Sequence, residues 1–162
     1  MGGDHPGRPA TAGWREWVGL PDLGIAHVKA KLDTGARTSA LHAFEIEELR
    51  RDGADWVRFE VHPWQRSKAD ARVVEWPVHD RRLVRSSTGH EQERIVIRTA
   101  LTLLGTPVTT EITLARRDEM GFRMLVGREA LRQGFVVDAA HSYLGGRPDR
   151  AVRQRNRRRA GA

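Results

Sequence analysis

The stretch "KAKLDTGARTSALHA", Lys29 to Ala43, decides how the chain is interpreted, because a strand-like run ends in an acid, a hydroxyl and a glycine. In the preceding "IAHVKAKL", apolar residues alternate with polar ones, which is the period-two pattern of a half-buried β-strand. Asp33, Thr34 and Gly35 follow this strand directly. Such residues suit an ordinary turn. They equally suit a catalytic site, since the carboxylate would project from the end of a rigid strand.

The composition predicts one ordinary domain. The chain has 162 residues, of which 39% are hydrophobic, enough for a single core. It contains no apolar run long enough to span a bilayer, and "MGGDHPGRPATAG" at the start lacks the hydrophobic region of a secretory signal. Cysteine is absent. We therefore expect a cytoplasmic protein without disulfides and without a membrane partner.

The positive charge of the chain is concentrated near its end. The segment from Arg147 onward holds seven Arg and one Asp, so the rest of the chain carries only +1 of the total +7. We expect a disordered N-terminal segment at 1–13, one domain at 14–146 and an Arg-rich disordered tail at 147–162. Such a tail can contact RNA or the ribosome without specificity, although a solubilising role is the simpler interpretation.

Short strands separated by turns make up most of the remaining sequence. "WVRFEVH", from Trp56, alternates apolar and polar residues, and "RDGAD" before it is typical of a hairpin loop. "LHAFEIEELRR", from Leu41, fits either a helix or a strand. The convincing helix is the short "GREALRQG" from Gly127, followed by the strand-like "FVVD". The pattern predicts an all-β barrel or sandwich with one short, late helix.

Two motifs together resemble a known family. Asp33-Thr34-Gly35-Ala36 is followed, about ninety residues later, by "FRMLVGREALRQGFVVD". This pair resembles the retropepsins, the retroviral-type aspartic proteases, and more closely the bacterial RimB-type proteins that are often labelled ATP-dependent zinc proteases. The resemblance implies a closed or partly open acid-protease barrel with one short C-terminal helix. It also implies that Asp33, Thr34 and Gly35 are catalytic, and that a downstream segment supports them, namely Leu125, Val126, Gly127 and Arg128.

The resemblance further implies an activity and an assembly. On this likeness, the activity of the family is removal of glutamate residues that a ligase has added to a small-subunit ribosomal protein. Amide hydrolysis by carboxyl groups requires one ionised group as base and one protonated group as acid. Because this chain has one Asp-Thr-Gly, we expect a homodimer in which each protomer supplies Asp33. The expected substrate is a glutamate-rich peptide or a modified ribosomal protein.

A mobile hairpin over the substrate is also expected, at "LVRSSTGHEQERIVI", Leu83 to Ile97. An ordinary exposed hairpin is the alternative. Arg37 stands where retroviral enzymes commonly have an acid, which suits a carboxylate substrate and leaves Arg128 to find another acidic partner. A cationic rim around the hairpin would comprise Arg81, Arg82, Arg85 and Arg94. The predicted substrate-binding residues are Ala36, Arg37, Arg85, Ser86, Ser87 and Gly89. Alternatively, Arg37 pairs structurally with a nearby acid and the hairpin arginines form a solvated face.

Two other classes of protein remain open at this point. The first is a non-catalytic module that binds acidic peptides, RNA or the ribosome through Arg37, the hairpin arginines and the tail. The second is a metal hydrolase with a site built from His62, His79 and a carboxylate. The sequence contains neither H-E-x-x-H nor G-x-x-x-x-G-K-[ST], so we predict no metal and no cofactor.

Overall fold

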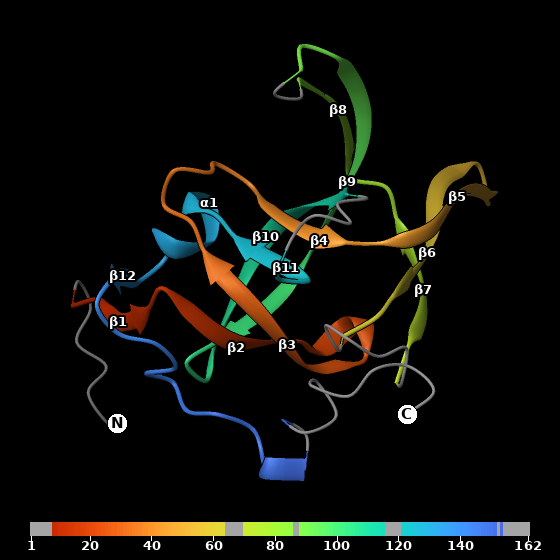
Figure 1. Ribbon diagram of the computed structural model, residues 1–162. Coiled ribbons are helices and arrows are strands. Elements are labelled where there is room, and N and C mark those ends of the chain that lie inside the picture. The colour runs from red at the N-terminus through yellow and green to blue at the C-terminus, as the bar shows by residue number, and fades with distance from the viewer. Residues whose placement is uncertain (1–7, 64–69, 86–87, 116–120, 152, 154–162) are drawn as a thin grey trace.

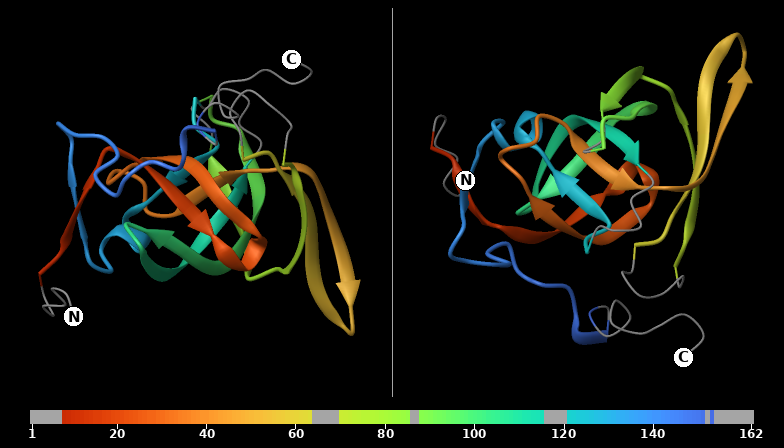
Figure 2. Two further views of the ribbon diagram at one scale, coloured as in Figure 1. Left: turned by 90° about the horizontal axis from the view of Figure 1, so that it is seen from below. Right: turned by 45° about the horizontal axis from the view of Figure 1, so that its top comes forward.

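The fold is a small closed barrel of β-strands with a second sheet beside it (Figures 1 and 2). It was obtained as a computed structural model, which describes residues 8–63, 70–85, 88–115, 121–151 and 153. The strands that form the barrel are β2 (Arg15–Leu20), β3 (Ile25–Leu32), β4 (Ser39–His42), β9 (Glu91–Leu103), β10 (Thr106–Ala115) and β11 (Met124–Val126). They follow one another in the order β10-β4-β11-β3-β2-β9, and pairing of β9 with β10 closes the ring.

Three smaller units extend from the barrel. β8 (Asp80–Arg85) adds to β9, and the two form a hairpin that projects upward in Figure 1. β5 (Phe44–Arg51), β6 (Ala54–Val61) and β7 (Arg72–Pro77) form a separate three-stranded sheet. β1 (Ala10–Gly13) pairs in parallel with β12 (Phe135–Asp138). The 3-10 turn η1 (Pro21–Leu23) joins β2 to β3, and the short helix α1 (Arg128–Leu131) lies between β11 and β12.

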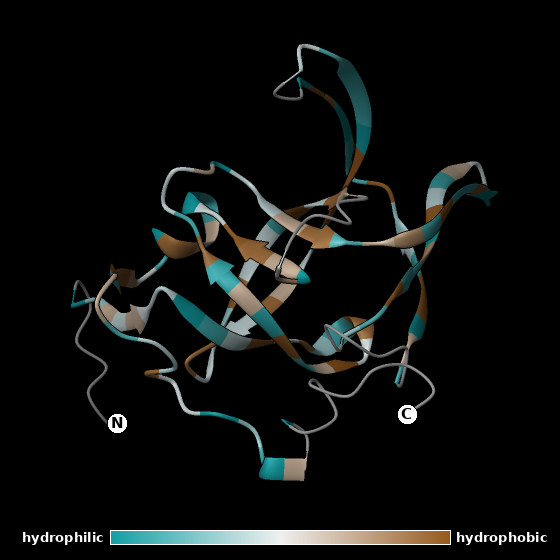
Figure 3. Ribbon diagram, in the orientation of Figure 1, coloured by the Kyte–Doolittle hydropathy of each residue, from teal (hydrophilic) through white to brown (hydrophobic). Residues whose placement is uncertain are grey.

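Apolar side chains from every strand of the barrel fill its interior. Figure 3 colours the ribbon by residue hydropathy, with the apolar residues of these strands in brown. Burying them is the main favourable term in folding, at about 25 cal/mol per Å² of apolar surface removed from water. From Val28 to Leu32 along β3, buried side chains alternate with more exposed ones, because successive side chains point to opposite faces. The largest fully buried apolar side chains of the barrel are Leu20, Val28, Leu41, Ile97, Leu101, Leu103, Ile112 and Met124.

The structure confirms the all-β, retropepsin-like barrel with a short late helix. The ambiguous stretch from Leu41 is strand, divided into β4 and β5, and Glu45 has a positive φ of 51° where the register of β5 shifts. The β5–β6 hairpin turns at Asp52 and Gly53, whose φ angles of 51° and 78° fit the tight turn that the sequence predicted. β1 lies inside the segment 1–13 that we had set apart from the domain.

Candidate active site

Asp33 directly follows β3 and is held by the neighbouring strand β11. The backbone N–H of Asp33 donates to the carbonyl of Val126, at 2.8 Å, where β11 runs parallel to β3. The carboxylate is half-buried, and its Oδ1 accepts a hydrogen bond of 2.8 Å from the N–H of Gly35. The N–H of Ala36 donates to the carbonyl of Asp33 at 3.2 Å, which closes the turn. The sheet therefore fixes the backbone of Asp33, and the turn fixes its carboxylate.

Gly127 lies directly beneath this turn. A Cβ on Gly127 would be 2.7 Å from the carbonyl carbon and oxygen of Thr38 and 2.9 Å from the carbonyl oxygen of Ala36. Its N–H donates to the buried hydroxyl of Ser39 at 3.1 Å. Glycine is needed here for close approach and not for a left-handed φ, since its φ is −99°. Ser39 is a buried supporting residue that our sequence interpretation missed.

Arg128 corrects one sequence prediction. We expected it to find an acidic partner, but its Nη1 donates to the backbone carbonyls of Thr34, at 3.0 Å, and Gly35, at 3.1 Å. Its own backbone N–H donates to the carbonyl of Ala36 at 2.8 Å. Two carbonyl dipoles that converge on one guanidinium nitrogen replace the expected carboxylate. Arg128 thus holds the Asp33 turn from below.

Arg37 forms the structural ion pair that was left open as an alternative. Its Nε donates to Oε1 of Glu129 at 3.3 Å, and Oε2 of Glu129 accepts from Arg132 at 3.0 Å. The side chain of Arg37 remains 79% exposed. One carboxylate therefore lies between two exposed cations at the edge of the turn, which leaves a net positive charge there. Glu129, which the sequence interpretation also missed, is recognisable only from this geometry.

The β8–β9 hairpin is the structure in which the mobile hairpin was predicted. It projects from the same side of the barrel as the loop that follows β3 (Figure 1). Arg85 pairs with Glu91 at 3.2 Å and is 72% exposed, while Gly89 is exposed with a φ of 85°. Ser86 and Ser87 lie outside the described residues. The predicted closure over a substrate stays a prediction.

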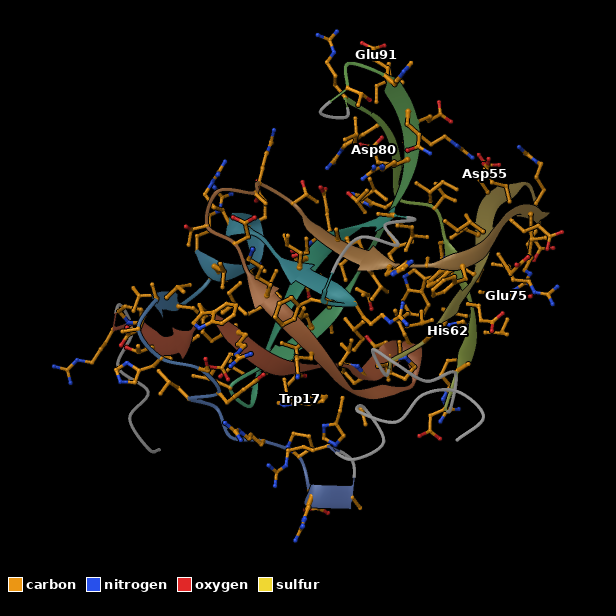
Figure 4. All side chains as sticks on the ribbon, viewed as in Figure 1. Trp17, Asp55, His62, Glu75, Asp80 and Glu91 are labelled. Carbon is orange, nitrogen blue, oxygen red and sulfur yellow. The ribbon has the colours of Figure 1, made fainter. Side chains whose placement is uncertain are left out.

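The cations at the base of this hairpin, which were predicted to belong to a cationic rim, are paired with acids. Arg81 binds Glu48 and, at 3.3 Å, Asp55, both from the β5–β6 hairpin. Arg82 binds Asp80 at 2.9 Å and Glu111 at 2.6 Å. Asp55, Asp80 and Glu91 are labelled in Figure 4, which shows them together on the upper right of the molecule.

These contacts also shift pKa values. The N–H of Arg81 and then the guanidinium of Arg82 hold the pKa of Asp80 below its ordinary value. Burial alone would raise the pKa of Glu111, but the hydrogen bond and charge of Arg82, together with His79, outweigh it and lower that pKa. Both carboxylates therefore stay charged to lower pH than usual, and they hold the hairpin base in place as anions.

The two histidines of the alternative metal site lie in separate pairs. His62 contacts Glu60 at 2.9 Å, and His79 contacts Glu111 at 3.2 Å. Within the described ranges, no group of three or more histidine or acidic side chains is placed to hold a metal ion. Nor does this part of the chain contain a helix with the length and apolar character to cross a membrane.

Comparisons with known proteins agree with this geometry. Residues 11–148 match the RimB-like family, described as retropepsin-like aspartic endopeptidase RimB. A probable alpha-L-glutamate ligase of Desulfotalea psychrophila is 44% identical over 128 residues, which are 79% of this chain and 28% of the relative. A probable alpha-L-glutamate ligase of Shewanella pealeana is 43% identical over 143 residues, which are 88% of this chain and 31% of the relative. The chain thus spans less than a third of these relatives.

A solved structure shows the same fold. It is Lpg0085 from Legionella pneumophila, a protein described as of unknown function, which superposes with a TM-score of 0.70 at 26% sequence identity. The match covers 84% of this chain and 98% of the other. The fold, the position of Asp33 and the extent of the family match lead to one conclusion: the chain belongs to the RimB-like family of retropepsin-like aspartic endopeptidases.

Proposed function

We propose that this protein hydrolyses amide bonds with a pair of carboxyl groups, Asp33 and the Asp33 of a second copy. The supporting observation is the placement of Asp33, which is fixed by the sheet on one side and adjoins the exposed Thr34 and Gly35 on the other. Two carboxyl groups at about 3 Å cannot both be ionised, so they share one proton. The ionised group then deprotonates water while the protonated group donates to the carbonyl oxygen.

The residues beside Asp33 have distinct roles in this proposal. A Cβ on Gly35 would lie 3.1 Å from Oδ1 of Asp33, so glycine keeps the carboxylate uncrowded. Thr34, exposed in the single chain, would donate beneath the paired carboxyl groups across the two-fold axis. Because each chain supplies one such turn, the homodimer is required by the chemistry.

The proposed substrate is a glutamate-rich peptide, such as a tail added to a ribosomal protein. Arg37 supports this, since its guanidinium is exposed next to the turn. Its acidic partner Glu129 also pairs with Arg132, so one carboxylate serves two cations. The curated relatives, named as probable alpha-L-glutamate ligases, carry a region like this chain within a longer polypeptide. A hydrolase domain attached to such a ligase would meet glutamate-rich products. In the same proposal, Arg85, Ser86, Ser87 and Gly89 of the hairpin close over the peptide.

The test is hydrolysis of an oligoglutamate-tailed peptide by Asp33→Asn. Turnover is expected to fall to background, because an amide cannot act as the base. Asp22→Asn is the matched control, since Asp22 is an exposed aspartate in η1, at the opposite end of β3 from the turn, and it should retain full activity. Wild-type turnover by Asp33→Asn would refute the proposal. Activity that survives in Asp33→Asn but is lost on chelation would instead favour the metal hydrolase.

A further inference from the structure

Glu129 bridges two exposed arginines beside the turn that carries Asp33. Its Oε1 lies 3.3 Å from Nε of Arg37, and its Oε2 lies 3.0 Å from Nη2 of Arg132. The two arginine side chains are 79% and 73% exposed, whereas that of Glu129 is 29% exposed. Each oxygen of the one carboxylate therefore serves a different cation, and both cations remain accessible to solvent.

The backbone holds this bridge next to the turn. The N–H of Glu129 donates to the carbonyl of Arg37 at 3.0 Å, and the side-chain amide of Gln133 donates to the carbonyl of Glu129 at 2.9 Å. The N–H of Ala36 donates to the carbonyl of Asp33 at 3.2 Å. α1 thus lies beside the loop that follows β3, as Figure 1 shows, and main-chain hydrogen bonds set the position of Glu129 relative to Asp33.

Glu129 differs in its contacts from the structural carboxylate of Glu16 on β2. Glu16 is 1% exposed, and its carboxylate accepts hydrogen bonds from three backbone N–H groups, those of Gly13 at 2.7 Å, Leu144 at 2.8 Å and Gly145 at 3.1 Å. These bonds tie the C-terminal segment to β2. Within the described part of the chain, the carboxylate of Glu129 contacts side chains alone. An external anion can therefore reach the partners of Glu129 but not those of Glu16.

Two cations share one acid in this bridge, whereas the base of the β8–β9 hairpin has the opposite balance. There, Arg82 alone contacts two acids. Among the described residues, Glu129 is the acid that pairs with Arg37 and with Arg132, so two positive charges and one negative charge leave +1. A guanidinium has more N–H donors than one carboxylate oxygen occupies. The two arginines therefore have both the charge and the donors to bind a second carboxylate.

The position of the bridge indicates which carboxylate it would bind. Arg37 follows Asp33 by four residues, in the same loop. A side chain held by Arg37 would thus belong to a residue close to the bond that is cleaved, not to a distant part of the substrate. Arginine recognises a carboxylate through two parallel hydrogen bonds, a geometry that favours a carboxylate over a neutral side chain. A glutamate next to the cleaved bond meets both conditions.

We propose that Arg37 and Arg132 together bind the side-chain carboxylate of a substrate glutamate next to the cleaved bond, and that Glu129 is a positioning residue that orients both arginines and competes with that carboxylate. The inference rests on the proposed function for its substrate, and it adds Glu129 and Arg132 to the residues that determine specificity. Loss of the Arg132 charge then weakens binding of an acidic chain. Loss of the Glu129 charge strengthens it, because the attraction of the arginines is no longer divided between two anions.

The experiment is a binding titration of fluorescent oligoglutamate against Asp33→Asn protein, so that no probe is consumed. Adding Arg132→Gln should weaken binding about threefold to fivefold, the effect of one exposed charge contact, and adding Glu129→Gln should strengthen it to a similar extent. The matched controls are Arg72→Gln and Glu47→Gln, which make the same charge changes at exposed positions on β7 and β5. Both controls should bind like the parent.

A kinetic measurement separates recognition from damage to the turn. In protein with Asp33 intact, Arg132→Gln should raise KM for the oligoglutamate-tailed peptide and leave kcat unchanged, because the contact is made equally in the ground state and the transition state. Glu129→Gln should lower KM. A distorted turn would lower kcat instead, since the carboxylate of Asp33 would be misplaced.

Three results would overturn this proposal. The first is unchanged binding by Arg132→Gln, and the second is unchanged or weaker binding by Glu129→Gln, which would mean that Glu129 does not compete with the probe. The third is an equal response of the control substitutions, which would mean that net charge alone attracts the probe. None of these results bears on whether Asp33 is catalytic, and wild-type turnover by Asp33→Asn would refute the proposed function alone.

Discussion

The tightest packing at the site predicts that Gly127→Ala will damage catalysis more than stability. The new Cβ would lie 2.7 Å from two backbone atoms of Thr38 and 2.9 Å from the carbonyl oxygen of Ala36. Ordinary van der Waals contacts begin at 3.4 Å. Either the backbone at Gly127 or the loop that contains Ala36 and Thr38 must therefore move by about half an ångström or more. Overpacking of this kind destabilises by about 1–3 kcal/mol.

The displacement would be transmitted to Asp33. The loop that must move is bonded to α1 by the N–H groups of Arg128 and Glu129, and it belongs to the turn that orients the carboxylate. Because a misplacement of about 1 Å can lower a rate by about a hundredfold, we expect kcat to fall tenfold to a hundredfold.

The measurements are urea unfolding and hydrolysis of the oligoglutamate-tailed peptide. Gly121→Ala is the matched control, because a Cβ there meets no atom within 4 Å. It should unfold and turn over like the parent. If Gly127→Ala matches the parent in both unfolding free energy and kcat, the close contact does not constrain the turn and the reasoning is refuted.

Two further substitutions test the supports around the barrel. Glu16→Gln should lower the free energy of unfolding by about 2–3 kcal/mol, because buried charge-assisted hydrogen bonds are lost, whereas the exposed Glu47→Gln should have no effect in urea unfolding. The pKa of Glu111 is lowered in the folded state, so its contribution is complete above the ordinary value of 4.5 and is lost as the pH falls through the lowered pKa. Glu111→Gln should therefore reduce the loss of stability as the pH falls from neutral to below 4.5. An unaltered slope of the unfolding free energy against pH would show that the Arg82 contact is too exposed to matter.

Local patterns in the sequence were sufficient to predict much of the barrel. The alternation within Ile25–Leu32 predicted β3, because buried and more exposed side chains alternate from Val28 onward. Asp52-Gly53 predicted a tight hairpin turn. β1 was missed because four residues carry too short a pattern, and its partner β12 is far away in sequence. The bulge in β5 was equally invisible, since a positive φ at Glu45 reflects tertiary packing.

The placement of the predicted site residues could be inferred where neighbours in sequence are neighbours in space. The turn at Asp33 follows directly from its strand, and Gly127 lies beneath it as the resemblance implied. The partners of Arg128 and Arg37 could not be predicted, because both contacts join segments more than ninety residues apart. Their charge suggested carboxylate partners for both arginines. It could not show that backbone carbonyl groups converge on Arg128 while Glu129 pairs with Arg37.

β3 contributes both to the core and to the outer surface of the barrel, because its two faces carry different side chains. Inward residues such as Val28 and Ala30 hold the strand in the core, and the outward Lys29 and Lys31 can be charged because they need not be buried. Since side chains alternate along a strand, the register that buries the first set also orients the second. The same register places Asp33 at the end of the strand. One hydrophobic pattern therefore sets both the position of the Asp33 carboxylate and the outward placement of Lys29 and Lys31.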